Sequence, residues 1–319
     1  MFHWKKLGRV FDPATVTDRP WLQQFAQAPC VLMFDEFVRV YFSCRPPADA
    51  AGQYASYSAF VDLDRRNLFN ILQVAREPIL ALGGTGMFDE FGTYPVSVVR
   101  DGDDVMAYYA GWTRCESVPF DVAIGVARSR DGGVTFDKLG SGPVLAASVD
   151  EPFVLSGPKI RRYDGQWQLW YIAGRKWVVA DGRPEPVYKI RMATSSDGLH
   201  WDKHNRDLIP SRVEEDEAQA CPDVFLHNGR YHMFFSYRHS QGYRGHEKGY
   251  RIGYAVSDDM LHWTRDDAKA GIDVSEDGWD SEMISYAHVF ALDDAIYMFY
   301  LGNQVGRHGF GLARLEGTL

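Results

Sequence analysis

Acidic residues recur in this chain just ahead of short β-rich runs, where several of them would be able to act together. The pairs are Asp89-Glu90, Asp150-Glu151 and Asp216-Glu217, and a fourth group holds Asp280 and Glu282. The first β-rich unit has only Asp18, at a looser distance. Two carboxylates that face each other suit acid/base chemistry on a glycosidic bond.

Cations recur behind the second β-rich run of four units. They are Arg45, Arg114, Arg175 and Arg238, with His239 directly after the last. In the fifth unit, Asn303 and Gln304 occupy this place, ahead of Arg307. The planar guanidinium fork suits carboxylate or phosphate groups. The acids and arginines therefore indicate either a site for a polar ligand or a set of structural ion pairs, and the sequence leaves both open.

The elements that must position these residues are repeated along the chain. One aromatic residue returns five times, at Trp4, Phe69, Phe136, Trp201 and Trp263, with intervals of 65, 67, 65 and 62 residues. The phrases that follow it are related, as in WKKLG from residue 4, FDKLG from residue 136 and WDK from residue 201. A fixed period indicates one supersecondary unit that is repeated.

Each unit has the pattern of four short strands. Between Tyr94 and Phe136, β-branched and aromatic runs alternate with Gly/Asp turns, which is typical of antiparallel strands. The second strands centre near Tyr41, Tyr109, Tyr171, Phe235 and Tyr300. A four-stranded unit that recurs in this way is a propeller blade. We therefore predict an all-β fold, a five-bladed β-propeller that takes residues 1–319 as one domain.

The two ends of the chain complement each other. The last unit, about residues 280–319, stops after its third strand, while the chain begins with a fourth-strand phrase at Trp4. Residues 2–11 are thus predicted to supply the outer strand of the last blade, which closes the ring and removes an exposed edge. Residues before the first strand and after the second strand of each blade converge on the central funnel, so we expect the acids and arginines to share one cavity.

Composition limits the classes of partner. The formal charge of −9 argues against a nucleic-acid backbone. The sequence contains no run of 18 apolar residues, so no transmembrane helix is predicted, and the N-terminus has no apolar signal region. The four cysteines, Cys30, Cys44, Cys115 and Cys221, have no paired short spacing, which favours free thiols in a cytoplasmic protein. The oligomeric state stays open.

Over nearly all of its length, the chain resembles the five-bladed propeller glycosidases: glycoside hydrolase families 43, 32 and 68, and the family 130 phosphorylases. The resemblance rests on the phrases 157–171 and 221–235 and on the Ser-x-Asp-Gly-x-x-Trp turn at 195–201. It implies a carbohydrate-active enzyme that cleaves or transfers a glycosyl unit.

The chain departs from these families where they carry catalytic carboxylates. Those places hold Ala28-Pro29, Thr93-Tyr94-Pro95, Ser156-Gly157-Pro158 and Ala220-Cys221. His288 stands where family 43 enzymes often carry an axial histidine, a position able to hold a calcium ion or a water. A structural role is expected for it.

Two hypotheses follow. In the first, the protein is an enzyme acting on an anionic or phosphorylated sugar, or with phosphate as acceptor, and its catalytic carboxylates are Glu217 and Glu90, then Glu151 and Asp89. Its predicted substrate-binding residues are Arg45, Arg114, Arg175, Arg238, His239, Glu282, Tyr94 and His288. No cofactor or metal is expected, apart from calcium or water near His288. In the second hypothesis the hydrolase activity is absent and the cavity only binds a glycan.

Overall fold

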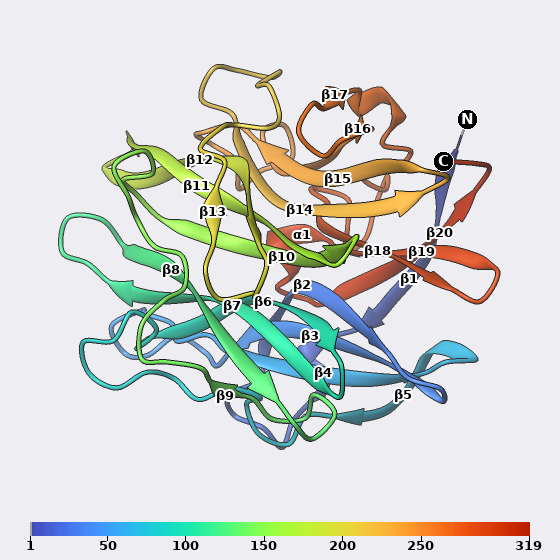
Figure 1. The fold of residues 1–319 in the computed structure, drawn as a ribbon, viewed down its shortest axis with the longest axis horizontal. Coiled ribbons are helices and arrows are strands. Elements are labelled where there is room, and N and C mark those ends of the chain that lie inside the picture. The colour runs from blue at the N-terminus through green and yellow to red at the C-terminus, as the bar shows by residue number, and fades with distance from the viewer. Residues whose placement is uncertain (1) are drawn as a thin grey trace.

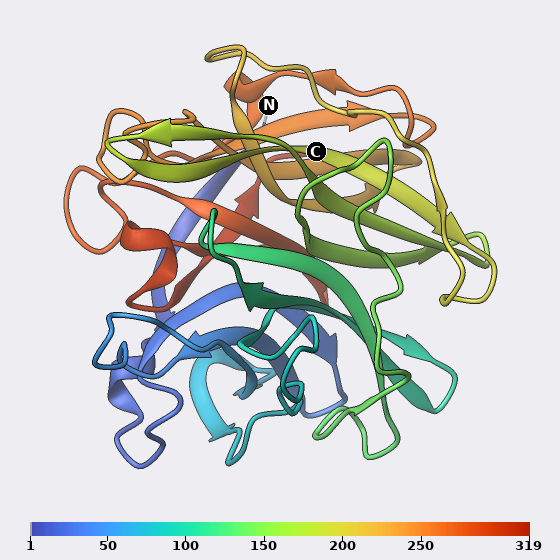
Figure 2. The ribbon, with the colours of Figure 1, turned by 90° about the vertical axis from the view of Figure 1, so that its left-hand side faces the viewer.

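Five four-stranded antiparallel sheets form a ring, which confirms the predicted five-bladed propeller (Figures 1 and 2). The structure is a computed structural model and describes residues 2–319. Each sheet runs outward from an inner strand near the axis, in the order that the sequence pattern predicts, and the loops between strands lie at the two faces of the ring.

The strands of the first three blades follow one another in sequence. Blade one holds β2 (Gln24–Met33), β3 (Phe37–Arg45), β4 (Tyr57–Asp64) and β5 (Asn67–Val74). Blade two holds β6 (Gly92–Asp101), β7 (Asp104–Arg114), β8 (Phe120–Ser129) and β9 (Asp137–Lys138). Blade three holds β10 (Leu155–Tyr163), β11 (Gln166–Ala180), β12 (Arg183–Ser195) and β13 (Asp202–Lys203).

The last two blades complete the ring. Blade four holds β14 (Ala218–His227), β15 (Arg230–Arg238), β16 (Arg251–Ser257) and β17 (Thr264–Arg265). Blade five holds β18 (Ser285–Leu292), β19 (Ala295–Leu301), β20 (Phe310–Glu316) and β1 (His3–Phe11). Among the described residues, helical structure is limited to the 3-10 turns Pro13–Thr15 and Asp267–Lys269 and to α1 (Asn303–Gly306). Within residues 2–319, no helix is long and apolar enough to cross a membrane.

The N-terminal strand closes the ring as predicted. β1 pairs antiparallel with β20, with His3 opposite Glu316 and Phe11 opposite Phe310. In Figure 1 the blue β1 runs beside the red strands of blade five, and the two termini lie close together. Trp4 packs edge-on against Phe234 of the neighbouring blade, with ring centroids 5.5 Å apart. The closing strand is therefore anchored by an aromatic contact as well as by its ladder.

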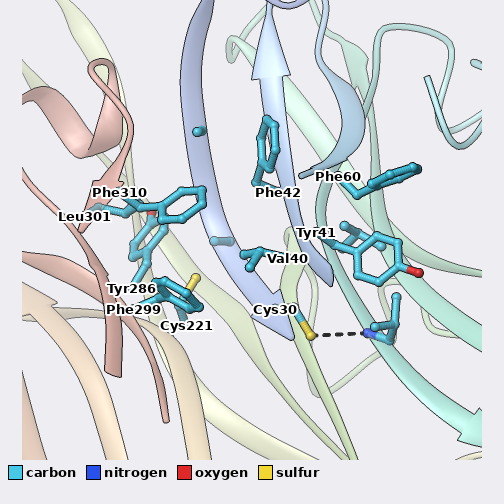
Figure 3. Packing of buried hydrophobic residues seen from close by; sticks show 14 of the residues in the cluster. Cys30, Val40, Tyr41, Phe42, Phe60, Cys221, Tyr286, Phe299, Leu301 and Phe310 are labelled. Atoms are coloured by element: carbon cyan, nitrogen blue, oxygen red, sulfur yellow. Dashed lines mark hydrogen bonds between the residues drawn. The ribbon is translucent and has the colours of Figure 1, made fainter. Parts of the chain in front are cut away.

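Aromatic side chains fill the space between blades, because tilted sheets diverge and large rings occupy the wedge. Figure 3 shows this packing where blades one and five meet. Phe42 lies 5.0 Å from Phe11 and 6.1 Å from Phe310, and Phe310 lies 5.2 Å from Phe299, all between ring centroids. Cys30 and Cys221 are buried in the same cluster as free thiols.

The Ser-x-Asp turns that precede the outer strands are held by their own side chains. Asp197 Oδ1 accepts hydrogen bonds from the backbone N–H groups of Leu199 and His200, each at 2.8 Å. Asp259 accepts equivalent bonds from Leu261 and His262, each at 2.8 Å. These turns therefore fix the position at which each outer strand rejoins its sheet.

The inner strand of every blade carries a β-bulge at the same place. The register slips between Gln27 and Cys30, Thr93 and Val96, Ser156 and Lys159, Ala220 and Asp223, and Ser285 and His288. Ala28, Cys221 and Tyr286 have positive φ at their bulges, an uncommon conformation for side-chain-bearing residues. Since bulges redirect side chains, the five of them determine what faces the axis.

Candidate functional site

A cavity of about 940 Å³ opens at the centre of one face. All five blades contribute to its wall, together with the loops after β3, β7 and β15 and the long β11–β12 hairpin. The segments 176–186 and 239–248 also reach the cavity, the first through Glu185 and the second through Tyr243. The cavity therefore lies where the repeat pattern places the central funnel.

The floor of the cavity is made by the five bulges. Each blade contributes one or two residues there, namely Gln27, Tyr94, Ser156 with Gly157, Ala220 with Cys221, and Tyr286. These include the positions at which the resembling families carry catalytic carboxylates. In the part of the chain that the structure describes, the floor carries no carboxylate, and its character is set by tyrosine and by small side chains.

Three of the four predicted catalytic acids lie outside the cavity in buried ion pairs. Asp89, Glu151 and Glu217 are fully buried and do not line the cavity. Lys138 Nζ lies 2.5 Å from Asp89, Lys203 Nζ lies 2.7 Å from Glu151, and Arg265 Nη1 lies 2.6 Å from Glu217. Each cation comes from the outer strand, two residues after the repeated aromatic residue.

Blade five has the same arrangement, in which Lys6 Nζ lies 2.7 Å from Asp280. In three blades a tyrosine of the second strand also donates a hydrogen bond to the acid. Tyr109 bonds Asp89 at 2.9 Å, Tyr171 bonds Glu151 at 2.8 Å, and Tyr300 bonds Asp280 at 3.0 Å. We call these four contacts the outer-strand ion pairs: Lys6–Asp280, Lys138–Asp89, Lys203–Glu151 and Arg265–Glu217.

Glu217 is held in its charged form. Burial works to raise its pKa, but hydrogen bonds from Arg265 and from the Gln219 amide outweigh burial and leave that pKa below the usual value. Two backbone N–H groups, of Arg212 and Val213, also donate to Glu217 Oε2. A general acid needs the opposite shift, so these contacts suit an ion-pair partner better than a proton donor.

The remaining predicted acids lie near the surface. Glu90 is half-buried and accepts a hydrogen bond from the Gly86 N–H at 2.9 Å. Glu282 is exposed, and its backbone N–H donates to Asn303 Oδ1 at 2.7 Å. Neither side chain lines the cavity, so the predicted convergence of the acids on the funnel does not occur in this structure.

The arginine positions are brought together in part. Arg45, Arg114 and Arg238 line the cavity, as does Tyr94. Arg175 is exposed on the outside, with Nε 3.9 Å from Asp207. His239 Nδ1 lies 2.8 Å from Glu214 and is also outside the cavity. The arginine half of the predicted site therefore assembles at the cavity, while the acidic half does not.

Sequence reasoning missed a cluster of tyrosines on the same wall. Tyr188 lies within β12 and Tyr250 lies directly before β16, and their hydroxyl oxygens are 2.6 Å apart. Tyr243 donates to Glu185 Oε2 at 2.6 Å, and Arg244 donates to the other oxygen of Glu185 at 2.7 Å. The signals available in the sequence are the equivalent places of Tyr188 and Tyr250, each 13 residues before the repeated aromatic residue, and the polar, aromatic segment 239–248.

Glu185 and Glu116 are the only acids that line the cavity among the described residues. Burial works to raise the pKa of Glu185, but hydrogen bonds from Arg244 and Tyr243 hold it below its usual value. Glu116 is exposed at the rim. A pair of carboxylates facing each other across a sugar, as glycosidic hydrolysis requires, is thus not formed by the floor residues.

His288 lies on the axis beneath the cavity floor and is almost fully buried. Its Nε2 accepts a hydrogen bond from the Val31 N–H at 3.0 Å, and its Nδ1 lies 3.2 Å from Asp223 Oδ1. Burial lowers its pKa to about 4, although Asp223 acts in the opposite direction. Residues 2–319 contain no cluster of three or more His, Cys, Asp or Glu side chains placed to hold a metal. The contacts of His288 tie blades one, four and five together at the axis.

The fold is shared with carbohydrate-active proteins of known structure. One glycoside hydrolase superposes with a TM-score of 0.76 at 14% identity, covering 99% of this chain and 92% of its own length. A thermostable family-43 glycoside hydrolase has a TM-score of 0.66 at 16% identity, and the match covers 92% of this chain and 88% of that one. The β-1,2-mannobiose phosphorylase from Listeria innocua, in complex with β-1,2-mannobiose, has a TM-score of 0.68 at 12% identity, and the match covers 99% of this chain and 96% of that one.

Sequence comparison identifies full-length relatives. The chain matches no protein-family model. It is 38% identical over 314 residues to the uncharacterized proteins MT1551 and Rv1502 from two strains of Mycobacterium tuberculosis, covering 98% of this chain and 99% of each relative. The chain therefore belongs to the same family as these two mycobacterial proteins, and it shares its five-bladed propeller fold with the glycoside hydrolases and the phosphorylase named above.

Proposed function

We propose that this protein binds an anionic carbohydrate, a sugar acid or a sugar phosphate, in its central cavity. The observation that carries the proposal is the lining: five arginines and six tyrosines face about 940 Å³, against two acids. Arginine supplies forked donors for carboxylate or phosphate, and aromatic rings supply faces for the C–H surface of a sugar. The volume falls within the range of small-ligand sites, roughly 300–1,000 Å³.

Binding without hydrolysis is the form of this function that the geometry supports best. Hydrolysis of a glycosidic bond needs two carboxyl groups about 5–5.5 Å or about 6.5–9.5 Å apart around the bond. Of the acids described, the cavity wall offers Glu116 and Glu185, and Glu185 is tied to Tyr243 and Arg244. A catalytic role for Glu217, Glu90, Glu151 and Asp89 stays a prediction that their contacts do not favour.

A second candidate function is glycosyl transfer to phosphate. Phosphate held by the cavity arginines would supply the nucleophile, so that only one carboxylic acid would be needed for the leaving oxygen. The observation in favour is Glu116, an exposed acid on the same wall as Arg114. Relatives in fold include a phosphorylase, which supports testing this reaction as well.

The test is calorimetric titration of the protein with a panel of charged and uncharged sugars. The panel would contain glucuronate, galacturonate, glucose 1-phosphate and mannose 1-phosphate, and glucose and mannobiose as uncharged comparisons. Saturable binding of the charged members, with no product after long incubation with or without phosphate, is the expected result. Turnover that requires phosphate would favour the second candidate, whereas turnover without phosphate would indicate hydrolysis and contradict binding alone. No binding of any sugar would contradict both candidates.

A further inference from the structure

The arginines that line the cavity differ in how many of their donors the protein already uses. Arg238 makes five hydrogen bonds, to the Tyr188 and Tyr250 hydroxyls and to the carbonyls of Pro186, His239 and Ser240. These contacts occupy all five of its N–H groups. Its guanidinium also stacks on Tyr243, 3.6 Å from the ring centroid. Arg238 is thus a structural part of the wall and has no donor left for a ligand.

Arg45 is in the opposite state. Its Nε donates to Ser56 Oγ at 3.1 Å, and neither of its Nη atoms has a hydrogen-bond partner among the described residues. No carboxylate from residues 2–319 lies within ion-pair distance of it. By contrast, Arg244 is paired with the Glu185 carboxylate, and Arg238 donates to neutral hydroxyl and carbonyl oxygens. Burial lowers the pKa of the Arg45 guanidinium, as expected for a cation that lacks a counter-charge.

Aromatic rings hold this guanidinium in a fixed place. Its Cζ lies 4.9 Å from the Phe25 ring centroid and 5.4 Å from those of Tyr54 and Tyr94. Contacts with ring faces do not use the N–H groups as hydrogen-bond donors to oxygen, so the Nη donors of Arg45 are free to meet a planar or tetrahedral anion. Arg45 is therefore presented to the cavity with most of its donors unused.

Arg114 adjoins the same place. It donates to the Tyr54 carbonyl at 3.0 Å, so the two arginines flank Tyr54, one at its ring and one at its backbone. Asp49 lies 3.9 Å from Arg114 but is half exposed, which makes it a weak counter-charge. Trp112 precedes Arg114 by two residues on β7 and lines the cavity, so both side chains leave the same face of the strand.

We propose that Arg45, with Arg114 beside it, is the anion subsite of the cavity and binds the carboxylate or phosphate of the ligand. The inference rests on the proposed function and predicts how the ligand is oriented in the cavity. Its charged group lies between blades one and two, and its sugar ring extends along Trp112 toward the tyrosine wall of blades three and four. Carboxylate and phosphate share the chemistry that Arg45 recognises, so both are used as probes.

The experiment is calorimetric titration with inorganic phosphate and, separately, with glucuronate. Arg45→Gln removes the charge and the fork, Arg45→Lys keeps the charge and loses the fork, and Arg130→Gln is the matched control in an exposed turn outside the cavity. We expect Arg45→Gln to weaken binding of at least one probe about tenfold or more, since hydrogen bonds to charged groups carry that much free energy. Arg45→Lys should fall between, and Arg130→Gln should match the wild type.

Circular dichroism and the unfolding midpoint of each variant show whether the fold is kept, and Arg45→Lys carries the comparison if Arg45→Gln does not fold. Wild-type affinity for both probes in Arg45→Gln, or no saturable binding of either probe by the wild type, would overturn the subsite. If uncharged sugars bind equally to the wild type and to Arg45→Gln, and neither probe binds, the protein binds carbohydrate but the anion subsite is contradicted. Phosphate binding that depends on Arg45, without binding of any sugar, would support the anion subsite and contradict the proposed carbohydrate function.

Discussion

Lys203 Nζ lies 2.7 Å from Glu151 Oε2, joining the outermost strand of blade three to the loop that enters its innermost strand. The same relationship recurs in blades two, four and five through the other outer-strand ion pairs. Each pair connects the outer strand of a blade to the loop that leads into its inner strand. In blades two, three and four it therefore helps to fix a two-residue outer strand that has few ladder hydrogen bonds of its own. In blade five it adds to the longer ladder of the closing strand β1.

Glu151→Ala is expected to destabilise the protein by about 3–5 kcal/mol, the usual cost of removing one partner of a buried pair. Arg191 and Lys203 would both lose the carboxylate that they share, at 3.1 and 2.7 Å. Urea unfolding followed by tryptophan fluorescence measures this, with the exposed Glu77→Ala as the control. Unchanged stability combined with lost turnover on an identified sugar would instead return Glu151 to a catalytic role.

The closure of the ring gives a second prediction, on two adjacent lysines of β1. Lys6→Met should destabilise the protein by about 3 kcal/mol, because it leaves the buried Asp280 carboxylate without the cation that lies 2.7 Å from it. Lys5→Met on the same strand should change stability by less than about 1 kcal/mol, since Lys5 is exposed and lies 3.7 Å from Glu316. Thermal unfolding of the two variants side by side is the measurement, and equal effects would count against the ion pair.

The fold was predictable because its determinants are local and repeated. Trp4, Phe136, Trp201 and Trp263 each lie at or next to the start of an outer strand, and together with Phe69 of β5 their spacing counts the five blades. The same phrases contain the cations of the outer-strand ion pairs, two residues after the aromatic residue. Blade one has Phe69 followed by the exposed Ile71, and its candidate acid Asp18 is exposed, so it has no such pair. The repeat thus contained both partners of each pair.

The site was less predictable, since it depends on which way side chains turn at the bulges and loop ends. The acids precede the inner strands as expected, but the tyrosines of the second strands and the outer-strand cations draw them between strands and away from the axis. Tyr188 and Tyr250 occupy equivalent places in the repeat, each 13 residues before Trp201 or Trp263, but the repeat alone does not predict that their hydroxyls meet across two blades. Contacts between residues about 60 positions apart are set by the assembled ring, which single positions do not reveal.

His288 predicts a loss of stability in mild acid. Its pKa is lowered to about 4 in the folded protein from the ordinary 6.5, so the unfolded chain takes up its proton first as pH falls. The stabilisation is therefore complete above about pH 6.5 and is lost as pH falls toward 4, by up to about 3 kcal/mol. The groups that face it are Asp223, Lys159 and Arg161, and the two cations oppose its protonation.

The variant that isolates this effect is His288→Gln, whose amide oxygen keeps an acceptor for the Val31 N–H but does not titrate over this range. Its free energy of unfolding should fall less between pH 7 and pH 4.5 than that of the wild type. His204 and His232 also have lowered pKa values through burial, and they contribute to both curves alike. Parallel curves for the two proteins would show that His288 does not carry the dependence.

Arg238 gives the last prediction, which separates a wall residue from a ligand-binding one. Arg238→Met should destabilise the protein by about 3 kcal/mol and loosen residues 239–250, because it leaves three carbonyls and two tyrosine hydroxyls of two blades without their donor. Arg244→Met should have an effect below about 1 kcal/mol, since that side chain is 59% exposed and bonds only Glu185. Hydrogen exchange over the loop measures both. If Arg238→Met keeps wild-type protection there and instead weakens binding of glucuronate or phosphate, then Arg238 has a free donor in solution, and the anion subsite extends across the cavity from Arg45 to this wall.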